Sequence, residues 1–172
     1  MNRATMARAA VAGFALVTLI SCAETGGPFG ADTFRAQYAA ARGFLEEGKY
    51  DRAQSRYEAL IPRAGPLTAR LRLEYAHALL RGGEYGRAVQ EATALAQGQK
   101  GKARAAALAV QGTGLHELGL EQLDKGDTAL GRDYLQKAEA AMATVVKHHP
   151  DLDPLGALAA RRAQIKVRLK AL

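Results

Sequence analysis

Apolar and polar residues alternate nowhere along this chain in the manner of a half-buried strand. Beyond residue 31 the chain is instead rich in Ala, Leu, Arg, Glu and Gln, which are among the strongest helix formers. Gly and Pro separate the helical stretches, so the pattern predicts an all-α protein. The expected helices cover residues 34–47, 53–61, 68–81, 88–97 and 102–123, then one that ends at residue 148 and a last one over 155–172.

The N-terminus carries a different pattern. Arg3 and Arg8 precede an apolar run over residues 9–20, which only Gly13 and Thr18 interrupt. A membrane-spanning helix needs about 20 apolar residues, so this run is too short to span and is typical of a secretory signal. It ends in the sequence Leu19-Ile20-Ser21-Cys22.

These four residues resemble the lipobox of bacterial lipoproteins: aliphatic, small or aliphatic, small, then Cys. The resemblance implies that residues 1–21 are a signal peptide, that cleavage precedes Cys22, and that Cys22 carries the lipid. Ala23 rather than Asp after the Cys leaves transport to the outer membrane open, and the expected location is the outer membrane, facing the periplasm. An ordinary cleaved signal and an uncleaved anchor are the alternatives.

Cysteine usage agrees with this interpretation. Cys22 is the only Cys of the chain, and a single Cys in an exported protein otherwise leaves an unpaired thiol. Attachment of two or more acyl chains would consume the thiol and hold the protein stably on its membrane. The Gly- and Pro-containing residues 22–31 are expected to form a flexible tether.

A repeat with a period of 35 residues follows the tether. The block Gly48-Lys49-Tyr50-Asp51-Arg52-Ala53 corresponds to Gly83-Glu84-Tyr85-Gly86-Arg87-Ala88. Each block joins two expected helices, and a helix–turn–helix repeat of this length indicates an α-solenoid. An ordinary helical bundle is the alternative.

The repeat resembles the tetratricopeptide repeat (TPR). Its small residues are Ala41 and Ala53 in the first unit and Ala76 and Ala88 in the second; its turns are Gly48 with Tyr50 and Gly83 with Tyr85. The large residue of the second helix is Tyr57 in the first unit but Ala92 in the second. A degenerate third turn at Gly126 lies 43 residues further on, with Thr128 in place of Tyr and Gly131 in place of Ala.

The resemblance therefore implies a right-handed α-solenoid of about three TPR-like hairpins plus a C-terminal capping helix. The hairpins occupy residues 32–151, divided as 32–66, 67–100 and 101–151, and the cap occupies 152–172. In TPR arrays the first helix of each pair lines a concave groove. The corresponding residues here are Arg35, Tyr38, Arg42, Leu45, Arg70, Leu73, His77, Leu80, Arg81, Thr113, His116, Leu120 and Leu123.

The sequence offers little catalytic chemistry. His116-Glu117 begins like a zinc-protease helix, but Leu120 stands where the second His is required. A cluster of imidazole and carboxyl groups lies at a helix end and consists of His148, His149, Asp151 and Asp153. Histidines near a helix C-terminus interact favourably with the helix dipole, and an Asp can cap the next helix, so these roles explain the cluster better than a metal site does. No enzyme activity, metal or cofactor is expected.

Charge narrows the choice of partner. The chain has 24 basic and 17 acidic residues, and the part after residue 21 keeps 22 basic residues. A basic groove suits an acidic or amphipathic segment of another envelope protein, and export places nucleic acid out of reach. The expected function is a lipid-anchored TPR adaptor, such as an accessory subunit of an envelope assembly, secretion or pilus machine. A basic surface that binds anionic lipid or glycan is the alternative, and a metal carrier or enzyme ranks last.

Overall fold

A computed structural model describes residues 31–172. The expected signal peptide, the lipobox with Cys22, and all of the expected tether except Ala31 lie outside these residues. The described part is all-helical and contains no strand, which confirms the all-α class expected from the sequence. Its helices are α1 (Ala31–Glu46), α2 (Tyr50–Leu60), α3 (Thr68–Arg81), α4 (Tyr85–Gly98), α5 (Gly101–Asp124), α6 (Thr128–His148) and α7 (Ala157–Ala171), with short 3₁₀ turns over Ile61–Arg63, Gly65–Leu67 and Pro150–Leu152. None of these helices is both long and apolar enough to cross a membrane.

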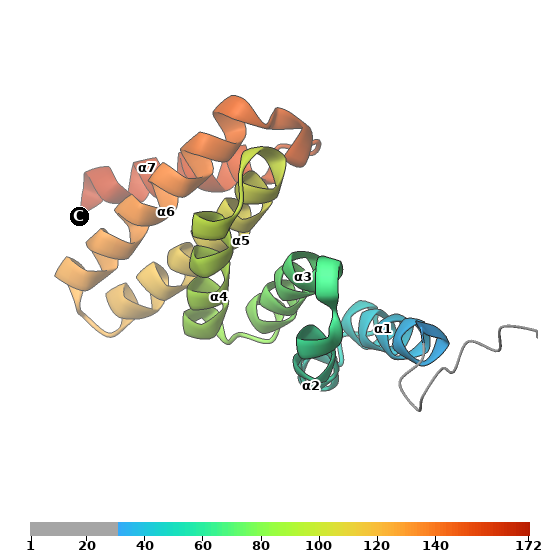
Figure 1. Ribbon diagram of the computed structural model, residues 1–172. Helices are drawn as coiled ribbons and strands as arrows, with labels where there is room; N and C mark the ends of the chain where they lie inside the picture. Colours follow the sequence, from blue (N-terminus) through green and yellow to red (C-terminus); the bar gives the residue numbers. More distant parts are fainter. Residues whose placement is uncertain (1–30) are drawn as a thin grey trace, which may run out of the picture.

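The helices pack as successive hairpins, α1 with α2, α3 with α4, and α5 with α6, and α7 then lies against α6 (Figure 1). Within each hairpin, a turn of the same geometry joins the first helix to the second. Gly48, Gly83 and Gly126 have φ of 75°, 82° and 84°, a conformation that only Gly adopts without strain. The residue after each Gly donates its backbone N–H to a carbonyl five residues back, at 2.8–2.9 Å, which closes the preceding helix.

Three helix starts differ from expectation for local reasons. α2 and α4 begin at Tyr50 and Tyr85, three residues earlier than expected, because the chain enters the helix almost directly after the Gly turn. α7 begins at Ala157 rather than at residue 155 because Gly156 has a left-handed backbone with φ of 70°. The Asp153 carboxylate accepts hydrogen bonds at 2.9 Å from the backbone N–H groups of Leu158 and Ala159, so this Asp caps α7 as expected.

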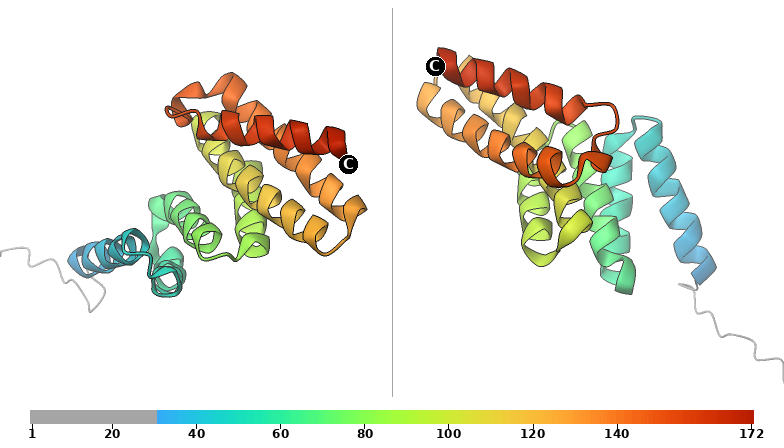
Figure 2. Two further views of the ribbon diagram at one scale, coloured as in Figure 1. Left: turned by 180° about the vertical axis from the view of Figure 1, so that it is seen from behind. Right: turned by 90° about the horizontal axis from the view of Figure 1, so that it is seen from above.

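The core is a series of clusters along the array rather than one central mass. The first cluster contains residues of all four helices from α1 to α4, and its large members include Tyr57, Leu71 and Leu79. Smaller clusters join α3, α4 and α5. The last packs Leu135 and Met142 of α6 against Ile165 of α7. The four small residues that carry the repeat, Ala41, Ala53, Ala76 and Ala88, are fully buried. As a result α1 and α7 lie at opposite ends of the molecule (Figure 2).

α5 and α6 approach each other more closely than side chains would allow. A methyl group on Gly119 would lie 3.2 Å from the Gly131 carbonyl oxygen, and one on Gly131 would lie 3.1 Å from the Gly119 carbonyl oxygen. A methyl group on Gly112 would lie 3.0 Å from Met142. These glycines therefore let the two helix backbones touch, and Gly131 occupies the small-residue position assigned to it from the sequence.

Candidate partner-binding face of α1 and α3

Two of the expected groove residues, Tyr38 of α1 and Arg70 of α3, contact one carboxylate, that of Glu74. Tyr38 of α1 donates its hydroxyl to Glu74 Oε1 at 2.6 Å, and Arg70 donates its Nε to the same oxygen at 3.2 Å. Tyr57 of α2 donates its hydroxyl to Glu74 Oε2 at 2.9 Å. We call Tyr38, Arg42, Tyr57, Arg70 and Glu74 the Glu74 cluster; it links three helices through one side chain.

The cluster combines aromatic and cationic groups at a partly exposed surface. The Arg70 guanidinium lies 5.8 Å from the centroid of the Tyr38 ring, within cation–π range. Burial and the neighbouring Glu74 raise the pKa of Tyr38, while the positive charges of Arg70 and Arg42 act in the opposite direction. Burial and Glu74 likewise raise the pKa of Tyr57. The hydroxyls of Tyr38 and Tyr57 thus remain protonated and donate to Glu74.

The two arginines of α1, Arg42 in the cluster and Arg35 nearer the start of the helix, lie on the surface. Arg42 pairs with Glu46 at 3.3 Å, one helical turn away, and Arg35 pairs with Asp32 at 3.4 Å near the start of α1. All four side chains are mostly exposed to solvent. Exposed pairs of this kind contribute little stability, so both arginines can exchange their partner for another anion.

His77 lies one turn beyond Glu74 on α3. The residue is exposed to solvent, yet its pKa is lowered, chiefly because surrounding protein displaces water from the imidazole. Glu74 raises this pKa and Arg81 lowers it. Arg81 itself stacks over the Tyr50 ring at 5.4 Å, and therefore faces the turn between α1 and α2.

The aliphatic members of the expected groove lie elsewhere. Leu73 and Leu80 are partly buried in the clusters between α3, α4 and α5, and Leu45 and Leu123 pack against the first and last clusters. Thr113 donates its hydroxyl to the carbonyl of Ala109 within its own helix at 2.9 Å. The exposed face of α1 and α3 is therefore polar and basic, with Tyr38 as its aromatic member.

His116 contacts α7 rather than the residues of this face. Its side chain is nearly buried, and Nδ1 lies 2.9 Å from Nη1 of Arg161 on α7. The same guanidinium pairs with Glu117. Burial lowers the pKa of His116, the charges of Arg161 and Arg168 lower it further, and Glu117 partly opposes them. Nδ1 also lies 3.2 Å from Glu117 Oε1. A neutral ring whose Nδ1 accepts from Arg161 agrees with the shorter contact and the lowered pKa, and Glu117 then pairs with the guanidinium alone.

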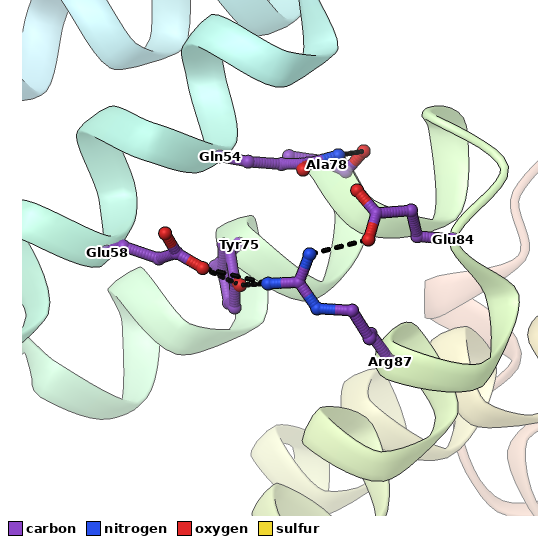
Figure 3. A network of polar contacts seen from close by, with 6 residues as sticks. All are labelled: Gln54, Glu58, Tyr75, Ala78, Glu84 and Arg87. Atoms are coloured by element: carbon purple, nitrogen blue, oxygen red, sulfur yellow. Dashed lines mark hydrogen bonds and ion pairs between the residues drawn. The ribbon is translucent and has the colours of Figure 1, made fainter.

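Glu74 was not among the residues expected from the sequence, although a signal for it exists. Tyr57-Glu58 on α2 faces Glu74-Tyr75 on α3, so each Tyr donates its hydroxyl to the Glu across the interface. Figure 3 shows the second of these pairs, where Glu58 and Tyr75 also contact Arg87, which in turn pairs with Glu84. The reversed Tyr/Glu order in two dipeptides 17 residues apart is the pattern that could have predicted the pairing.

The C-terminal cluster of His and Asp residues is spread out in the structure. Asp153 caps α7, and Asp151 pairs with Lys102 at 2.6 Å, which lowers the pKa of its carboxyl. Within residues 31–172, no three side chains of His, Cys, Asp or Glu are grouped as a metal site would require.

No family model, no curated protein and no solved structure matches this chain.

Proposed function

We propose that this protein is a lipid-anchored, TPR-like adaptor that binds an acidic or amphipathic segment of another envelope protein on the face formed by α1 and α3. The observation that supports the proposal most strongly is the Glu74 cluster with its flanking residues. It places Tyr38, Arg42, Arg70 and His77 side by side on the first helices of two consecutive hairpins.

The TPR-like interpretation is supported by the way sequence period and structure coincide. The turns at Gly48 and Gly83 are 35 residues apart and share one backbone geometry. The small residues that the TPR pattern requires on facing helices are all fully buried. A right-handed superhelical path with α7 as its cap is part of the proposal.

The charge of the face favours an anionic partner. Glu74 already accepts hydrogen bonds from two tyrosines and Arg70, so its negative charge is largely satisfied within the protein. Arg35 and Arg42 hold exposed carboxylates only weakly. A partner carboxylate can therefore replace Asp32 or Glu46, and an apolar side chain can lie on the Tyr38 ring.

Photocrosslinking in cells tests the partner-binding face. A photoreactive amino acid would replace His77, and the control would carry it in place of Gln90, which is exposed on α4 of the same hairpin. We expect a discrete protein adduct from position 77 alone, lost in an Arg42→Glu/Arg70→Glu background. Equal adducts from both positions, or adducts only with lipid or glycan, would contradict the adaptor and favour the basic surface binder.

The anchor is tested separately. Metabolic labelling with a clickable palmitate analogue should label the wild-type protein and not a Cys22→Ser variant, and fractionation should place the wild type in the outer membrane. Absence of label from the wild-type protein would reject lipid attachment without affecting the binding face.

A further inference from the structure

The C-terminal end of the array contains a hollow that the proposed adaptor face does not use. It has a volume of about 700 Å³ and lies between α5, α6 and α7. Aliphatic side chains form most of its wall, and three polar side chains complete it. The aliphatic residues are Leu120, Leu135, Ala163, Ile165, Val167 and Ala171, and the polar ones are His116, Gln164 and Arg168.

The α7 side of this hollow exposes apolar surface. Ile165 is buried against α5 and α6, whereas Val167 is 70% exposed. Ala163, Val167 and Ala171 recur every four residues and so line one side of the helix. Small residues at this spacing let another helix approach closely, and an exposed β-branched residue beside a hollow offers it an apolar contact.

Charge around the hollow is positive. α7 carries five basic residues and no acidic one; the basic residues are Arg161, Arg162, Lys166, Arg168 and Lys170. Glu117 and Glu139 pair with the first three of them. Arg168, in the wall of the hollow, forms no ion pair with the described residues, and its charge helps to lower the pKa of His116.

We propose that the hollow and the Val167 side of α7 form a second docking site, whose occupant is an acidic amphipathic helix of a partner protein. Its apolar residues would rest on Leu120 and Val167, and its carboxylates would pair with Arg168. The site is separate from the Glu74 cluster, because α7 and α1 lie at opposite ends of the array (Figure 2).

Charge and position decide between this occupant and two others. A second copy of the chain would bring another basic α7 to the same place, and like charges would oppose the contact. The residues ahead of α1 include one acidic side chain, Glu24, and so bring little negative charge to Arg168; α1 itself lies at the end of the molecule remote from α7 (Figure 1). An acidic partner meets neither obstacle.

Peptide binding to the full chain in detergent tests the proposal. The probe is a labelled helical peptide of about 18 residues with Leu on one face and Glu on the other; the control peptide has Lys in place of each Glu. Fluorescence anisotropy would measure affinity, and the methyl resonances of Leu120, Ile165 and Val167 would locate the contact. We expect the acidic peptide alone to bind and to shift these resonances.

Matched variants give the test its specificity. Arg168→Glu and Lys170→Glu change the charge of the same helix by the same amount, but only Arg168 lies in the wall of the hollow. We expect Arg168→Glu to weaken binding about tenfold, Val167→Ser about threefold, and Lys170→Glu less than about twofold. Because both charge variants alter exposed residues, their helical circular dichroism should match the wild type.

Four outcomes would overturn the proposal. They are no binding of the acidic peptide, equal binding of the lysine peptide, and equal weakening by Arg168→Glu and Lys170→Glu. The fourth is that Val167→Ser abolishes self-association of the wild-type chain or its binding to phosphatidylglycerol vesicles. Loss of self-association would assign the site to a second copy, and loss of vesicle binding would assign it to a membrane. Crosslinking from position 77 is independent of all four, so either site can fail alone.

Discussion

Two interfaces of this array hold their helices together by opposite means. Between α2 and α3, reciprocal Tyr and Glu side chains reach across from both helices, with Tyr57 bonded to Glu74 and Tyr75 bonded to Glu58. Between α5 and α6 the backbones themselves touch, because Gly119 and Gly131 have no side chains to separate them. The first interface depends on direction and charge, and the second depends on shape.

The difference affects what each interface can do besides hold the fold. The Tyr/Glu interface places polar groups at the surface, where Tyr38, Arg70 and His77 can also meet a partner. The glycine interface excludes solvent and fixes the position of α6, on which α7 packs through Ile165. We therefore expect substitutions to affect the two ends of the molecule in different ways.

The largest effect is expected at the glycine interface. Gly131→Val forces a branched side chain against Leu123 and the Gly119 carbonyl, and should lower the free energy of unfolding by about 3 kcal/mol. The matched control is Gly86→Val on α4, where nothing lies within 4 Å of the added Cβ, and it should stay within about 0.5 kcal/mol. Urea denaturation measures both, and equal losses would mean that close backbone contact does not matter.

A smaller effect is expected at the Tyr/Glu interface. Glu74→Ala removes the acceptor of Tyr38 and Tyr57 and should cost about 2 kcal/mol, because the fully buried Tyr57 keeps an unsatisfied hydroxyl. Adding Tyr57→Phe removes that hydroxyl, so the double variant should be no less stable than Glu74→Ala. The exposed pair partner Glu46 provides the control, since Glu46→Ala should change stability by less than about 0.5 kcal/mol.

Additive losses in that double-mutant cycle would show that the hydroxyl and the carboxylate act independently. The interface would then depend on apolar packing alone, and the contrast with α5 and α6 would disappear.

The smallest effect is expected from pH. The pKa of His116 and that of His77 are both lowered in the folded state from the ordinary value of 6.5. As pH falls through about 6.5 the unfolded chain binds protons that the folded chain does not, so the free energy of unfolding decreases until pH drops below the lowered values. Thermal midpoints between about pH 7.5 and pH 5.5 should decline in the wild type and less steeply in His116→Gln and His77→Gln. If the thermal midpoint declines equally steeply with falling pH in the His77→Gln/His116→Gln double variant, other titratable groups cause the decline.

Much of the fold could be predicted because its determinants are local. Gly48 and Gly83 make turns for a reason contained in the single residue, and Thr68–Arg81 has the bounds expected from its flanking residues. Asp153 likewise acts on the helix that follows it.

The Glu74 cluster and the contact of His116 with α7 were harder to predict because they join distant residues. Tyr38 and Glu74 are 36 residues apart, and the contact between Arg161 and His116 spans 45. Helical periodicity places each residue on a face but does not reveal which helix will cover that face. This is why Leu73 was expected in the groove although it packs in the core, and why Glu74 was overlooked.

The core clusters follow one another along the molecule, and this arrangement has a mechanical consequence. A pull on the chain ahead of α1 would load α1 first, and α1 is held by its hairpin contact with α2 and by the bond from Tyr38 to Glu74. Because the core is divided into clusters that join neighbouring helices, such stress passes from one hairpin to the next. We therefore expect the N-terminal hairpin to unfold first under tension while α5, α6 and α7 stay folded. Its unfolding would lengthen the chain and limit the force that reaches the rest of the molecule.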